Sequence, residues 1–397
     1  MTQSESIESS GFPLAFKVRQ GQTRSALAAA GTGRDVFLAE ARQIGGHQKE
    51  CVVREGAGGS AFRLVSDEGA QLKGTDLAPF PLGFYSAGLT GDLANRILAG
   101  ARARAIAIQD LAIEVHNRYS MTGSFFQGTG VGAAEPARIK VRAASPATSA
   151  QIDALVRDAA QASPALATMR GALTNTFALY VNGRRRQVTS LPPSHAPDAA
   201  DPFVTYRKPP APLDGAAAAR DLVAKTGQTT QGDFVYQAVE TKGRVVIDVW
   251  GNCRLLDPAG VTETVVRLGF PRTSHFAIHS DERAGADSAP CGLALTSAGI
   301  VFCYITQLLR YIEHQKLNIR GVRVVQTSPY GLAGSPAGGW TGSAEPVDTH
   351  LFLNGDASED AYEKLMTVAA RTCYLHAALG ATLPPEITIE HGEQPAA

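Results

Sequence analysis

The chain has 397 residues, of which 44% are hydrophobic and 19% charged, a composition typical of a globular protein. Basic and acidic residues both number 37, so the formal net charge is zero and no overall field attracts nucleic acid or an anionic membrane. No apolar stretch approaches the ~18 residues that span a bilayer, and the polar start does not resemble a signal peptide. We therefore expect a soluble cytoplasmic protein with no nucleic-acid or membrane partner.

The first half is expected to begin with a disordered tail over residues 1–12, followed by a folded unit over 13–190. Short apolar runs separated by Gly-rich turns predict a meander of strands, and a long helix is predicted over about 82–105. Apolar residues at i, i+3, i+4 and i+7 predict a one-faced helix over 149–169. The strands predicted in this unit are 16–19, 36–41, 51–54, 62–65, 111–115 and 139–141.

A Pro-rich segment separates the two halves and predicts a linker over residues 191–222, because dense prolines prevent regular structure. The second unit, 223–390, repeats the order of elements, and Ser358 is expected to cap its closing helix. Strands followed by long helices, without βαβ alternation, predict an α+β fold of antiparallel strands packed on long helices. The elements predicted here are strands 234–239, 245–250, 261–268, 276–279, 322–326 and 349–353, and helices 292–315 and 358–379.

Three segments of the first half recur in the second at offsets of 211, 214 and 210, which predicts a tandem duplication. At these offsets Asp92 falls on Cys303, and Ser163 falls on Cys373. A core position that drifts neutrally would hold Ala, Val or Leu, so polar substitutes indicate the wall of a pocket. The recurring segments are 78–88 as 289–299, 62–68 as 276–282, and 149–168 as 359–378.

The five cysteines are an odd number without a C-x-x-C pair, which predicts free thiols rather than a disulfide framework or a zinc site. No His, Asp or Glu cluster has metal-ligand spacing, and no cofactor is expected. Cys51 and Cys253 are interpreted as packing residues, and Cys291 as a turn residue before the second long helix. Taken singly, Cys303 and Cys373 could also be small buried hydrophobes.

The arrangement in the second half resembles the OsmC/Ohr family, the osmotically inducible protein C and organic hydroperoxide resistance proteins. The resemblance covers both halves, about 300 residues. It implies an intramolecular pseudo-dimer, in which two units of one chain replace the family's dimer and the site lies between them; further oligomerisation is left open. The matching stretches are Ser280-Asp281-Glu282, Ala289-Pro290, 293–303 and 368–376.

The chemistry that the resemblance implies is thiol-dependent reduction of organic hydroperoxides, with a hydrophobic small molecule as substrate and a dithiol as reductant. Cys303 would attack the O–O bond, and Cys373 would resolve the sulfenic acid as a disulfide. The attacking thiolate needs a nearby positive charge, which the family takes from an upstream arginine. The candidates for that arginine are Arg254, Arg267 and Arg272. The family's glutamate, about nine residues before the first cysteine, is replaced by Ala294.

Two other functions remain open from the residues. A thiolate with a histidine base could attack a carbonyl as a cysteine hydrolase does, and His376 lies three residues after Cys373, on the same face of one predicted helix. Alternatively, the halves could hold an apolar ligand without catalysis. The local histidines are His275, His279 and His376, and the expected substrate-binding residues are Asp92, His279 and Phe302.

Overall fold

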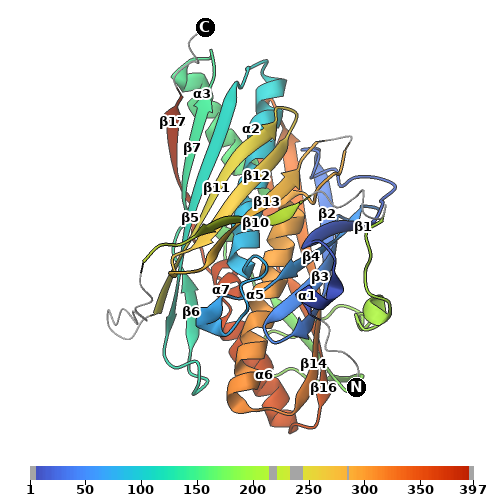
Figure 1. Cartoon of the computed structure of the whole chain (residues 1–397). Helices are drawn as coiled ribbons and strands as arrows, with labels where there is room; N and C mark the ends of the chain where they lie inside the picture. Colours follow the sequence, from blue (N-terminus) through green and yellow to red (C-terminus); the bar gives the residue numbers. More distant parts are fainter. Residues whose placement is uncertain (1–5, 214–220, 233–244, 284–285, 393–397) are drawn as a thin grey trace.

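The computed structural model describes residues 6–213, 221–232, 245–283 and 286–392, and these fold into two sheets that enclose two long helices (Figure 1). The first sheet has the strand order β1-β4-β3-β2-β14-β16-β8-β9, with β15 beside β14. Its strands are β1 Ala15–Arg19, β2 Gly33–Gly45, β3 Gln48–Arg54, β4 Ala61–Ser66, β8 Thr176–Val181, β9 Arg184–Arg186, β14 Ile319–Ser335, β15 Gly338–Ala344 and β16 Asp348–Gly355.

The second sheet has the corresponding order β10-β13-β12-β11-β5-β7-β17, with β6 beside β5. Each sheet therefore combines strands from both halves of the chain, joined where β2 pairs with β14 and where β11 pairs with β5. The strands of this sheet are β5 Asp110–Thr122, β6 Val131–Ala134, β7 Arg138–Ala144, β10 Val223–Thr229, β11 Val245–Asp257, β12 Val261–Leu268, β13 Ser274–Asp281 and β17 Glu386–His391.

The mixed α+β class is confirmed, but the sheets are not purely antiparallel as predicted. Strand β8 pairs with β16 in parallel, and β17 pairs with β7 in parallel. Both exceptions follow a pair of helices, and a chain that crosses a sheet face through helices can return in a parallel direction. The predicted strand 234–239 lies outside the described residues.

Helices α2 (Pro81–Ala103) and α5 (Gly292–Gln315) pack against each other between the sheets. Helix α2 contacts β5, β11 and β12, whereas α5 contacts β2, β3 and β14. One continuous core of buried residues therefore runs through both halves. The sequence analysis expected no segment long and apolar enough to cross a bilayer, and α5 is an exception by length and composition. Its apolar stretch is wholly buried inside the protein, as is usual for a core helix.

The crossing of α2 and α5 depends on Gly88 and Gly299, which occupy equivalent positions in the recurring segments. A Cβ added at Gly88 would lie 2.6 Å from the carbonyl oxygen of Gly292 and 2.6 Å from the amide nitrogen of Thr296, and one added at Gly299 would lie 2.7 Å from the amide nitrogen of Tyr85. Neighbouring backbone cannot move as a flexible side chain can. The two helices can approach this closely only because both positions lack a side chain.

We expect Gly88→Ala to destabilise the fold by about 1–3 kcal/mol, the usual cost of overpacking a core. Helix propensity alone would favour alanine by about 1 kcal/mol, so a loss of stability identifies the steric effect. Urea denaturation of Gly88→Ala measures it, with Gly171→Ala as the control because a Cβ there meets nothing within 4 Å. Equal stability of Gly88→Ala and the wild type would contradict the close crossing.

The two predicted one-faced helices are each interrupted once. Helix α3 (Ser149–Ala162) ends at Ser163, where α4 (Pro164–Arg170) begins; α6 (Glu359–Thr372) ends at Cys373, where α7 (Tyr374–Leu379) begins. Both junction residues have extended backbone, with φ −74° and ψ 114° at Ser163 and φ −70° and ψ 115° at Cys373. The break lifts both side chains out of the regular helical surface. Ser358 caps α6 as predicted, by accepting a hydrogen bond from the amide of Ala361.

The N-terminal segment is only partly as predicted. Residues 1–5 lie outside the described residues, but Ile7–Ser10 form a short helix, α1. Ile7 is buried, and its amide donates to Gln48 Oε1 at 2.8 Å. The expectation of a disordered tail over 1–12 is therefore wrong for this part, because one apolar side chain and one hydrogen bond hold it on the first sheet.

Candidate functional site

Cys303 and Cys373 lie together at the centre of the molecule. Cys303, on α5, is 2% exposed, and Cys373, at the α6–α7 junction, is fully buried. Burial raises the pKa of Cys373 well above its usual value, and the adjacent Cys303 raises it further through a side-chain hydrogen bond and through its charge. The amides of His376 and Leu375 oppose that rise. Cys373 therefore stays in the thiol form near neutral pH.

The equivalent positions of the first half make the same contact with different chemistry. Ser163 Oγ donates to Asp92 Oδ2 at 2.5 Å, and the amide of Ala165 donates to the same oxygen at 3.1 Å. Asp92 also forms a fully buried ion pair with Arg96, at 2.6 Å. A hydrogen-bonded carboxylate therefore occupies the place that a thiol occupies in the second half.

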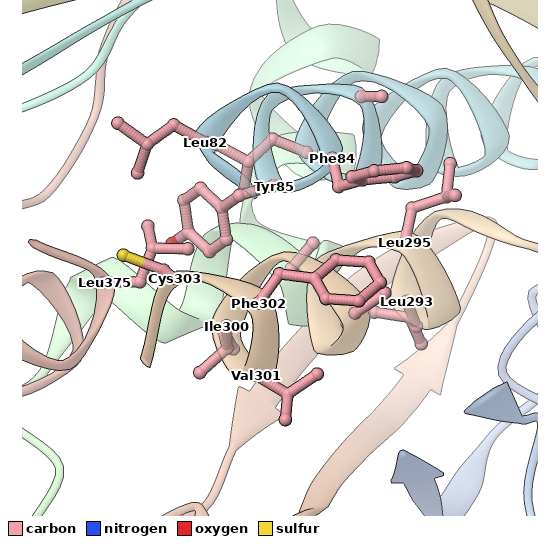
Figure 2. Packing of buried hydrophobic residues seen from close by; sticks show 14 of the residues in the cluster. Leu82, Phe84, Tyr85, Leu293, Leu295, Ile300, Val301, Phe302, Cys303 and Leu375 are labelled. Atoms are coloured by element: carbon pink, nitrogen blue, oxygen red, sulfur yellow. The ribbon is translucent and has the colours of Figure 1, made fainter. Parts of the chain in front are cut away.

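A small cavity of about 40 Å³ lies beside Cys303. Its walls are mainly apolar and come from both halves, and Figure 2 shows the side chain of Cys303 extending from α5 in the same part of the core as Tyr85 and Leu375. A cavity of this volume holds about one water molecule. Its apolar lining includes Phe80, Leu82, Leu268, Phe270 and Tyr374, and its polar lining comprises Glu68, Gln71, Thr306 and Gln307.

A buried ion pair from the first half adjoins the cavity. Lys49, on β3, is fully buried, and its Nζ lies 2.9 Å from Oε1 of Glu68, just after β4. Thr306 Oγ1, one helical turn beyond Cys303, donates to the same oxygen. The sequence analysis used Glu68 only as part of a recurring segment and missed Lys49. No clear signal in the sequence marked Lys49, because β3 (QKECVVR) also contains Gln48, Glu50 and Arg54.

The three candidate arginines do not face Cys303, and that prediction is wrong. Arg254 is largely exposed and pairs with Glu263 at 2.8 Å. Arg267 stacks over the ring of Trp250 at 3.8 Å. The inward residues of β12 alternate from Thr262 to Leu268, which places Arg267 on the outer face. Arg272 is exposed in a turn, with φ +63°.

The expected substrate-binding residues are also not brought to Cys303. His279 lies on the outer side of β13 and contacts Glu263 at 3.2 Å. Phe302 is a fully buried core residue that packs on Phe84, with ring centroids 5.5 Å apart. Asp92 belongs to the equivalent position in the first half, as described above. Phe302 and Cys303 are consecutive on α5 and point to different sides of it (Figure 2).

Of the candidate histidines, only His376 lies beside the thiol pair. Its imidazole is buried between Phe177 and Tyr304, with ring centroids at 5.4 and 5.2 Å. Burial lowers the pKa of His376 to about 4, so the ring is neutral near pH 7. His275 instead contacts the Thr230 hydroxyl at 3.2 Å. His376 and Cys373 were predicted to share one face of a single helix. The break at Cys373 separates α6 from α7, so they do not, although the two residues remain neighbours in the chain.

The other three cysteines are free and buried. Burial raises the pKa of Cys253 to about 11 and raises the pKa values of Cys51 and Cys291 well above the usual range. Cys291 lies at the N-cap of α5, where its amide donates to Glu55 Oε1 at 2.6 Å. These thiols therefore fit packing roles more closely than nucleophilic ones.

No protein-family model matches the sequence, and no curated protein matches it. A solved structure that is similar to part of the chain is an OsmC-like hydroperoxide resistance protein from Jannaschia sp. CCS1. The match has 23% sequence identity and a TM-score of 0.22, and covers 30% of this chain and 77% of that chain. A similarity this low carries no argument about activity, so the function has to be inferred from the site itself.

Proposed function

We propose that this protein is a thiol-dependent enzyme that reduces organic hydroperoxides, with Cys303 as the nucleophile and Cys373 as the resolving thiol. The observation that supports the proposal is the position of Cys303 in the wall of a mainly apolar cavity, close enough to Cys373 to raise the pKa of that thiol. Two thiols in contact can form a disulfide without a large movement of the backbone. The half of the chain without cysteines at these positions holds Asp92 and Ser163, which have no such chemistry.

The reaction takes place in two steps. The Cys303 thiolate attacks the hydroperoxide; an S–O bond forms, the O–O bond breaks, and the alkoxide takes a proton and leaves as an alcohol. The Cys373 thiol then attacks the sulfenic sulfur; an S–S bond forms, the S–O bond breaks, and water leaves. A dithiol reductant returns the pair to two thiols by exchange through a mixed disulfide.

Lys49 and Glu68 are proposed to replace the arginine and glutamate that the OsmC/Ohr resemblance implies. A thiolate needs a nearby cation, and the candidate arginines of the second half face away from the cavity. Lys49 is buried and held by Glu68, which lines the cavity and bonds to Thr306 on the helix that carries Cys303. Glu68 would thus supply a carboxylate that Ala294 does not, from a different position along α5.

The whole chain is proposed to be an OsmC-like pseudo-dimer of two tandem units, 13–190 and 223–390. The exchange of strands between the halves in both sheets supports it, as does the contribution of first-half residues to the Cys303 cavity. A chain with five free thiols fits the reducing cytoplasm. We place the protein there on this basis.

A cysteine hydrolase is supported less well by the same geometry. Such an enzyme needs a histidine within hydrogen-bond reach of its nucleophile. His275 and His279 are engaged elsewhere, and neither ring nitrogen of His376 has a hydrogen-bond partner. Cys303 therefore has a second thiol, Cys373, as a neighbour, but none of the three candidate histidines is hydrogen-bonded to it.

Intact mass measured after one equivalent of an organic hydroperoxide such as cumene hydroperoxide tests the proposal. The expected result is a loss of about two mass units, because a disulfide forms with loss of two hydrogens, and peptide mapping should place it between Cys303 and Cys373. Cys253→Ser is the matched control, a buried thiol outside the site that should leave the loss unchanged. An unmodified protein, or a disulfide between other cysteines, would overturn the proposal.

A further inference from the structure

Tyr304 and His376 form a buried polar pair that makes no hydrogen bond in the described structure. The Tyr304 hydroxyl and both ring nitrogens of His376 are inaccessible to solvent and have no partner, and the two rings meet edge to face with centroids 5.2 Å apart. A buried polar group left in this state destabilises the folded protein. Buried polar groups without a hydrogen-bond partner need an explanation, which can be a bound water molecule or a function.

The first half shows that the fold does not need polar groups at these places. At the offsets of the recurring segments, Tyr304 corresponds to Leu93, and His376 corresponds to Leu166. Both leucines are fully buried, so an apolar side chain fits each position. The polar pair therefore occurs in the half that carries the two thiols. In the first half, where Asp92 and Ser163 stand in place of the thiols, leucines stand in place of the polar pair.

The pair lies against the thiol that keeps its proton. Tyr304 follows Cys303 directly in α5, and a negative charge on Cys373 raises the pKa of Tyr304, so the phenol is within electrostatic reach of that sulfur. His376 is in the first turn of α7, which Cys373 begins, and its amide interacts with the Cys373 sulfur. The neutral imidazole has one nitrogen able to accept a proton and one able to donate.

We propose that Tyr304 and His376 transfer the proton of Cys373 during disulfide formation, a role that rests on the proposed function. The imidazole of His376 accepts the Cys373 proton as the sulfur attacks the Cys303 sulfenic acid, and returns it to the departing hydroxide, which leaves as water. The Tyr304 hydroxyl, unpartnered in the reduced protein, donates a hydrogen bond to the transient Cys373 thiolate.

The test follows the two chemical steps separately in two variants. His376→Leu introduces the leucine that the first half has at this position, and Tyr304→Phe removes only the hydroxyl. Rapid mixing with cumene hydroperoxide follows peroxide loss, and dimedone trapping followed by mass measurement follows the Cys303 sulfenic acid. We expect peroxide loss at the wild-type rate and a sulfenic acid that persists roughly a hundredfold longer in His376→Leu, the usual scale of general acid–base catalysis. Tyr362→Phe, a buried hydroxyl bonded to the amide of Ala357 at 3.1 Å, is the control and should resolve normally.

A thermal unfolding measurement separates this role from a structural one. Removing unpartnered polar atoms should leave His376→Leu as stable as the wild type or more stable, because leucine already fits the equivalent position. Sulfenic acid that resolves at the wild-type rate in both variants would overturn the proton transfer while leaving the peroxidase intact, as would an equal slowing of both steps. If the wild type consumed no peroxide and formed no disulfide, the proposed function itself would fail.

Discussion

Cys303→Ser is expected to lose hydroperoxide reduction by on the order of a thousandfold or more, as enzymes do when the nucleophile is removed. A serine hydroxyl is a far weaker nucleophile than a thiolate, and no other described cysteine adjoins the cavity. Cys373→Ser should behave differently. It keeps the attacking thiol and should therefore consume about one equivalent of peroxide and stop at the sulfenic acid.

Single-turnover peroxide consumption, with the protein in excess, distinguishes the two variants. The expected order is full consumption by the wild type and by Cys373→Ser, and negligible consumption by Cys303→Ser. If Cys373→Ser were as inactive as Cys303→Ser, the assignment of the two roles would be wrong. If Cys303→Ser retained activity, the nucleophile would have to be sought elsewhere, first at Cys291.

The contrast between these variants follows from the positions of the two sulfurs. Cys303 lines the cavity and Cys373 does not, so a substrate reaches the first thiol before the second. Burial also raises the pKa of Cys373, which disfavours Cys373 as the attacking thiolate. Access and charge therefore select the same nucleophile.

Sequence patterns predicted the local elements of this fold well. The bounds of α5 and β12 match the predicted 292–315 and 261–268, because a long apolar helix and an alternating strand carry strong periodic signals. The pairing of Cys303 with Cys373 was expected from the resemblance and stays a prediction. The breaks at Ser163 and Cys373 were missed, since the apolar period continues across them.

The rest of the site could not be found from local patterns because it depends on strand exchange. Periodicity tells which residues share a face, but not which distant strand covers that face. Lys49 and Glu68 lie more than 230 residues before Cys303 in the chain, and Glu68 lines the same cavity as Cys303 in a core where β3 packs against α5. Arg254, Arg267 and Arg272 were misleading for the same reason. They precede α5 closely in the chain, but none of them lies on the face of the sheet that packs against the helices.

Arg96→Met is expected to destabilise the protein by about 3–5 kcal/mol, the largest effect on stability that we predict, because it leaves the Asp92 carboxylate buried without its cation. Both side chains are fully buried, and Arg96 Nη2 also donates to the carbonyl oxygen of Leu27 at 2.7 Å. The charge of Asp92 already contributes, after burial, to raising the pKa of Glu282 to about 8. Removing Arg96 takes away a positive charge that offsets the negative charges of Asp92 and Glu282.

Urea denaturation of Arg96→Met, Asp92→Asn and the double variant measures the coupling between the two side chains. The double variant should be clearly less destabilised than the sum of the single variants, because neither charge then remains alone. Gln307→Met is the matched control: Gln307 is the equivalent of Arg96 beside Cys303, where no carboxylate at position 303 needs a cation, and we expect a loss under about 1.5 kcal/mol. Additive losses would mean that the ion pair does not stabilise the first half. If the coupling is strong, a cysteine substituted at Asp92 alone should also destabilise the first half, because it would leave Arg96 as the unpaired charge.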